Sequence, residues 1–220
     1  MQQYLKYITA LLACASFWVG LSAQEKPAKL MERFQGQMQA YTAVEMHIKL
    51  SGMQASGLAV PSAESQIFFQ SSDYALISEE LEVYVQGGVK WSYMPGIAEA
   101  VVAENDASNG DLLDNPLILF SPSFSKFYKL DGNTVSGSRD GEATTEILCR
   151  PLDKRAAYSA LHLVLRQRDL QPLYIKLMAI DGAWYQIDIT QFTVKDAPFP
   201  VARFNFSPEA HPGVYVTDLR

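Results

Sequence analysis

The chain has 220 residues, of which 48% are hydrophobic and 19% are charged, and its formal net charge is −6. This balance is ordinary for a globular protein, and the length suits one large domain or two small ones. The acidic balance argues against a nucleic-acid partner, because the sequence offers no basic stripe to phosphates.

The first 23 residues have the features of a secretory signal peptide. Lys6 precedes the apolar run Tyr7–Leu21, and two small residues, Ser22 and Ala23, follow it. The run is too short to span a membrane comfortably. We therefore expect cleavage near Ala23 and export of the chain.

A lipid anchor is the alternative fate of this segment, since Leu11–Cys14 resembles a bacterial lipoprotein cleavage box. Apolar residues continue to Leu21, however, beyond the point where such a mature chain turns polar. Residues 24–220 show no repeat and no low-complexity tract, so they are predicted to form a single domain.

An amphipathic helix is predicted to open this domain. Pro27 suits the first turn of a helix, and apolar residues recur after it at intervals of three and four. These residues are Leu30, Met31, Phe34, Met38 and Tyr41. The stripe that they form is expected to cover a sheet.

Strands are predicted for most of the remaining chain. Val44–Leu50 alternates apolar and polar residues, as a half-buried strand does. Leu81–Ala103 contains a hairpin at Gly87-Gly88 and a third strand after Pro95-Gly96, which together make a three-stranded meander. Asp-Gly pairs predict further hairpins at Asp140-Gly141 and Asp181-Gly182.

The pattern continues to the C-terminus. The runs 126–130 and 134–135 are predicted to form a hairpin through Asp131-Gly132-Asn133, and 201–206 and 214–216 are predicted as late strands. The total is about eleven strands. With few helices available for parallel crossovers, the expected fold is mainly β with a few helices (α+β), built on an antiparallel sheet, sandwich or barrel.

A short apolar segment stands beside a polar connection. Asn105–Asn115 is polar, and Pro116 after it can start a helical turn that is apolar nearly all round. That turn consists of Leu117, Ile118, Leu119 and Phe120. It is interpreted either as a movable cover over an apolar site or as a plain core helix.

No catalytic or metal-binding constellation is apparent. His47, His162 and His211 each lack a second ligand at metal-like spacing. Cys149 lies in a strand-like run with no neighbouring His, so a buried apolar filler is favoured over a nucleophile. We expect no enzymatic activity, no metal and no cofactor.

Binding of an apolar ligand, such as an acyl chain, in a cavity is the better-supported function. A strongly curved antiparallel sheet has a concave side, and helices that fill it only partly leave an apolar cavity. The candidate lining residues are Met46, Ile48, Leu50, Phe68, Val89, Trp91 and Tyr93. The competing interpretation is that these side chains simply pack on one another.

Three segments resemble the LolA family of periplasmic outer-membrane lipoprotein carriers. Val83–Pro95 is similar to that family's hairpin, with Trp91, Tyr93 and Pro95 at the matching positions. Asn115–Phe120 is similar to its short lid helix, and Phe204–Asp218 to its C-terminal segment. The likeness spans nearly the whole chain after the signal peptide.

The resemblance implies an unclosed barrel of about eleven strands with a helical lid over an apolar cavity. It also implies a periplasmic carrier that takes lipoproteins by their acyl chains from an inner-membrane transporter to an outer-membrane acceptor. The same fold serves periplasmic regulatory proteins that sense lipids or lipoproteins, and this is the alternative function.

Two departures from the family pattern concern the lid. Family members carry an Arg before the strand that corresponds to Asp73–Ser78, and this Arg helps to latch the lid. The segment here, Gln70–Tyr74, has no Arg, and Gly87-Gly88 replaces an Asp-Gly pair. The latch is therefore expected to be absent or built differently.

Overall fold

The computed structural model describes residues 25–106, 112 and 115–220. The predicted signal peptide, the alternative anchor at Cys14 and most of the connection 105–115 lie outside these residues. Within the described ranges, no helix combines the length and apolar character needed to cross a membrane.

The elements follow one another in the order that the sequence pattern predicts, and strands dominate. Among the described residues they are α2 (Pro27–Ala40), β1 (Ala43–Met53), β2 (Ala59–Gln70), β3 (Asp73–Ser78), β4 (Glu82–Gln86), β5 (Val89–Met94), η1 (Pro95–Ile97), β6 (Glu99–Glu104), η2 (Pro116–Phe120), η3 (Pro122–Lys126), β7 (Tyr128–Arg139), β8 (Glu142–Pro151), β9 (Tyr158–Arg166), β10 (Pro172–Ala179), β11 (Trp184–Lys195), η4 (Val201–Phe204), η5 (Pro208–Ala210) and β12 (Tyr215–Asp218).

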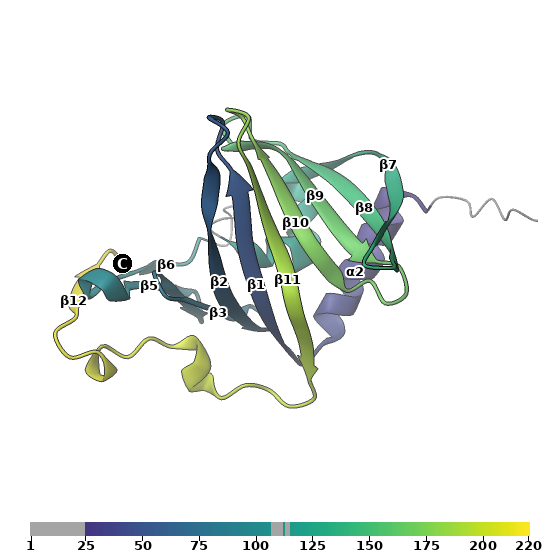
Figure 1. Cartoon of the computed structure of the whole chain (residues 1–220). Coiled ribbons are helices and arrows are strands. Elements are labelled where there is room, and N and C mark those ends of the chain that lie inside the picture. The colour runs from purple at the N-terminus through teal and green to yellow at the C-terminus, as the bar shows by residue number, and fades with distance from the viewer. Residues whose placement is uncertain (1–24, 107–111, 113–114) are drawn as a thin grey trace, which may run out of the picture.

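All twelve strands of the described chain belong to one bent sheet in the order β12-β6-β5-β4-β3-β2-β1-β11-β10-β9-β8-β7 (Figure 1). Its two edges, β12 and β7, do not pair, so the barrel is unclosed, as expected. Neighbouring strands are antiparallel except β12, which runs parallel to β6. The expectation of a purely antiparallel sheet is wrong at this edge, because the C-terminal segment crosses back over the sheet before β12 begins.

Two predicted strand features are wrong. Asp131-Gly132-Asn133 is a bulge inside the continuous strand β7, because the runs on both sides of it pair with the same partner, β8. Gly132 takes a φ of +67°, which suits a bulge as well as a turn. The predicted strand 201–206 instead begins with the 3-10 turn η4, because its phenylalanines pack onto a sheet face and leave the sheet edge to β12.

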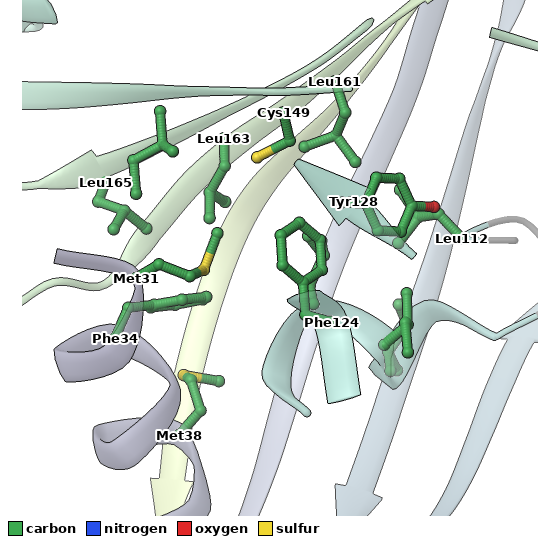
Figure 2. Close-up of a cluster of buried hydrophobic side chains, with 14 of the residues drawn as sticks. Met31, Phe34, Met38, Leu112, Phe124, Tyr128, Cys149, Leu161, Leu163 and Leu165 are labelled. Atoms are coloured by element: carbon green, nitrogen blue, oxygen red, sulfur yellow. The ribbon is translucent and has the colours of Figure 1, made fainter. Parts of the chain in front are cut away.

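The helix α2 covers one part of the inner sheet face. Its buried side chains are those predicted from the stripe, Leu30, Met31, Phe34 and Met38. Figure 2 shows Met31 and Phe34 facing Leu163 and Leu165 of β9. Phe34, Leu163 and Leu165 have no exposed surface, so this half of the sheet is fully packed.

Replacing Phe34 with Ala is expected to lower the free energy of unfolding by about 3–5 kcal/mol, because it removes a fully buried ring and leaves a cavity. Glu32→Ala on the exposed face of the same helix is the control and should change stability by less than about 0.5 kcal/mol. Urea denaturation followed by tryptophan fluorescence measures both. Equal effects would show that α2 does not cover the sheet as described.

Candidate functional site

The sheet has two faces with different covers. We call the face that packs against α2, η2 and η3 the inner face; it carries Met46, Ile67 and Leu163. The opposite, outer face carries Phe68 and Trp91, which pack against the C-terminal segment. Strand side chains alternate between the two faces, so a residue's place in its strand determines whether it packs against the helical elements or against the C-terminal segment.

An apolar pocket lies on the inner face where α2 does not reach. Its volume is about 190 Å³, and strands β1 to β5, β10 and β11 contribute to its floor. Ile67, Leu76, Ile175, Ile187 and Ile189 are among the floor residues, and Leu117 and Phe120 of η2 form the roof. Lys90 is the one charged residue among the described lining residues. The pocket therefore suits an apolar ligand.

Two of the seven predicted cavity residues line this pocket. Met46 and Ile48 face it from β1, where the sheet is most central. Leu50 lies on the same face, because its partner across β11 is the floor residue Ile187, but it does not reach the pocket. Met46, Ile48 and Leu50 therefore share the inner face of β1, as their alternation predicts.

The other four predicted cavity residues are on the outer face, so placing them in the cavity was wrong. Trp91 and Tyr93 pack on Phe206, with ring centroids 5.3 and 5.0 Å apart, and Val89 alternates with them on the same face. Phe68 meets Phe199 edge-on at 5.5 Å. The aromatic side chains of the hairpin formed by β4 and β5 pack against the C-terminal segment, which shields them from water.

The four residues predicted as the lid all lie in η2. Ile118 and Leu119 of η2 are buried in the core, and Leu117 and Phe120 face the pocket. The ring of Phe120 stacks on Phe69 of β2 at 5.1 Å. Two residues of η2 therefore lie over the apolar pocket, and the other two are packed in the core.

Structural comparison finds the same fold in other proteins. An uncharacterized conserved protein from Thermus thermophilus matches with a TM-score of 0.57 at 10% identity, over 87% of this chain and 98% of that chain. A LolA superfamily protein from Nitrosomonas europaea also matches, with a TM-score of 0.43 at 10% identity, over 83% and 98%. No protein-family model and no curated protein matches by sequence.

The chain has the fold of the Thermus thermophilus protein, an unclosed sheet bent into a barrel. The sequence resemblance to the LolA family implies this architecture, an unclosed sheet with one covering helix and a short apolar segment. Identities this low establish the fold alone, so the function must be argued from the site.

Two glutamines of α2 hydrogen-bond to η2 and to Ser121, the residue after it. The Gln35 Nε2 amide donates to the carbonyl oxygens of Leu119 and Ser121 at 3.1 and 2.9 Å, and Gln39 Nε2 donates to the Phe120 carbonyl at 3.0 Å. Gln35 and Gln39 are one helical turn apart and so share a face of α2. We call these three hydrogen bonds the latch; no Arg takes part in them.

The sequence did not reveal these glutamines or the floor residues of β10 and β11. Gln35 and Gln39 lie among other polar residues of α2. Nothing in the local sequence distinguishes a glutamine that bonds to another segment from one whose amide is hydrated. Ile175, Ile187 and Ile189 lie on strands that were predicted correctly, but their position opposite β1 depends on strand order. Strand order is set by long-range pairing, which local periodicity does not encode.

Cys149 is packed in the inner core and has no exposed surface. Burial raises the pKa of its thiol to about 12. A thiol with so high a pKa holds almost no thiolate at neutral pH, and thiolate is the reactive form. The favoured interpretation of Cys149 as an apolar filler agrees with this packing.

Removal of the latch is expected to loosen the lid without unfolding the protein. We expect the double substitution Gln35→Ala and Gln39→Ala to raise the rate at which a fluorescent fatty-acid probe enters by about tenfold, since two hydrogen bonds to η2 and one to Ser121 directly after it are lost. Stopped-flow fluorescence measures this rate.

Gln37→Ala is the matched control for the latch. Its amide also bonds across the fold, but to the Asp169 carbonyl at 2.6 Å, away from η2. Its entry rate should stay at the wild-type value. An unchanged rate in the Gln35/Gln39 variant would mean that η2 does not gate the pocket.

Alkylation tests the environment of Cys149. With iodoacetamide at pH 8, the peptide that contains Cys149 should remain unmodified in the folded protein and react within minutes in urea, because the buried thiol stays protonated. Peptide mapping by mass spectrometry follows that peptide separately from Cys14. Rapid labelling in the folded state would contradict the described core.

Proposed function

We propose that the chain binds the acyl chains of lipoproteins between η2 and the inner sheet face and carries them through the periplasm. The observation on which the proposal rests is an apolar pocket roofed by a short segment that hydrogen-bonds to α2. The sequence resemblance to the LolA family supplies lipoproteins as the ligand class.

The size of the pocket indicates a closed lid. A volume of about 190 Å³ holds roughly six groups the size of a water molecule, at about 30 Å³ each. Ligand pockets usually measure roughly 300–1,000 Å³. A lipid with long chains therefore fits only when η2 moves away from Ile175, Ile187 and the other floor residues.

The energies involved permit such a movement. Each latch hydrogen bond contributes about 0.5–1.5 kcal/mol, so the three together contribute roughly 3 kcal/mol. Burying one methylene contributes about 0.8 kcal/mol. Roughly four methylenes under the lid thus offset the latch hydrogen bonds. Exposing Ile118 and Leu119 costs about 1.5–3 kcal/mol each, and the further methylenes of a complete acyl chain offset that cost.

The partners in this proposal are an inner-membrane lipoprotein-releasing transporter and an outer-membrane acceptor. A carrier between them binds and releases its cargo without changing it, so no catalytic group is required. A latch of a few weak hydrogen bonds suits this role, because tight closure would slow the release of cargo to the acceptor.

The pocket floor provides the direct test. Ile175→Asn is expected to weaken binding of a fluorescent acyl probe about tenfold, since it places an amide among apolar side chains. Lys176→Asn changes the next residue of β10, which points to the outer face beside Trp184, and should bind as wild type does. Titration of the probe, with melting temperatures as a check of folding, measures both.

Similar losses in the Ile175 and Lys176 variants would contradict binding at the inner face. Trp91→Ala provides a second comparison, because Trp91 packs on Phe206 on the outer face. If Trp91→Ala weakened probe binding more than Ile175→Asn did, the ligand would lie under the C-terminal segment instead.

A further inference from the structure

A second pocket lies on the other side of η2 from the apolar one. Its volume is about 460 Å³, more than twice that of the apolar pocket. Tyr74, Leu117 and Phe120 line both pockets, so a single layer of side chains separates them. A ligand that displaces η2 therefore reaches both pockets at once.

The chemistry of this second pocket differs from that of the first. Its lining includes four serines and two asparagines, namely Ser71, Ser72, Ser121, Ser123, Asn105 and Asn115. Among the described lining residues there is no Asp, Glu, Lys, Arg or His. The described part of the lining thus offers hydroxyl and amide groups without a side-chain ionic charge.

Such a lining favours some lipid heads over others. Hydroxyl and amide side chains both donate and accept hydrogen bonds, so they satisfy esters, amides and hydroxyls. A phosphate placed there loses its hydration and gains no cationic partner, which is costly. At about 30 Å³ for each water-sized group, the pocket holds roughly fifteen groups, enough for a glyceryl diester head.

We infer that this second pocket holds the uncharged, ester- or amide-bearing head of the ligand whose acyl chains enter the apolar pocket. The inference rests on the proposed function and narrows it, because it selects acylated glyceryl or N-acyl heads against phospholipids. Specificity of this kind is a difference between two affinities. It lets a carrier bind its cargo in the presence of membrane phospholipid.

Competition between short-chain lipids tests the inference on the full chain. Dioctanoylglycerol and dioctanoyl phosphatidic acid carry identical chains and differ in the head, and each is titrated against a bound fluorescent acyl probe. We expect the neutral lipid to displace the probe at a concentration about tenfold lower. A triacylated lipopeptide forms a third arm, and tighter binding of it than of dioctanoylglycerol identifies a lipoprotein rather than a free lipid as the source of the head.

A charge added to the pocket should change the preference. Ser123→Lys places an ammonium group in the lining, while the backbone N–H of residue 123 can still donate to Ser121 Oγ. We expect this variant to bind dioctanoyl phosphatidic acid about tenfold more tightly than wild type does. Ser125→Lys adds the same charge at an exposed position of η3 that does not line the pocket, and it should behave as wild type does.

The outcomes separate this inference from the proposed function. Equal displacement by the two dioctanoyl lipids, or tighter binding of the phosphatidic acid by wild type, overturns the inference while probe binding still supports the carrier. Equal responses of the two Lys variants overturn it as well, and if Ser123→Lys does not fold, the wild-type comparison decides. Failure of wild type to bind any acyl probe overturns both.

Discussion

An apolar sheet face must be covered along its whole width, and one helix of fourteen residues covers only part of it. On the side of β9, the α2 stripe packs against Leu163 and Leu165 and leaves no exposed surface. On the side of β2 and β3 the cover is the five-residue turn η2. The site exists because this second cover is short and incomplete.

The outer face of the sheet is covered by the C-terminal segment. The chain leaves β11, crosses the outer face from Phe68 of β2 to Trp91 of β5 and joins the sheet edge as β12 (Figure 1). Phe204 and Phe206 are buried along this path, against Phe68 and Trp91 respectively. The outer face is therefore covered through long-range packing and strand pairing. On the inner face, η2 is held by the burial of Ile118 and Leu119 and by the three latch hydrogen bonds, two to η2 and one to Ser121.

Much of the fold and part of the site could be predicted from the sequence. The α2 stripe, the alternation of β1 and the turn at Gly87-Gly88 are local patterns that can be recognised without knowing which segments meet in the fold. The face of the Trp91 hairpin could not be predicted, because alternation shows that two faces exist without showing which one is inside. The glutamine latch and the pocket-floor residues of β10 and β11 could not be predicted either. They depend on contacts between segments far apart in the sequence, and the periodicity of one segment carries no information on such contacts.

The central claim is that acyl chains bind between η2 and the inner sheet face, and a crystal structure with a bound triacylated lipopeptide tests it most directly. The account predicts chain density against Ile175 and Ile187, with η2 displaced from its contacts to Gln35 and Gln39. Chains found beside Trp91 under the C-terminal segment, with η2 still in place, would contradict it.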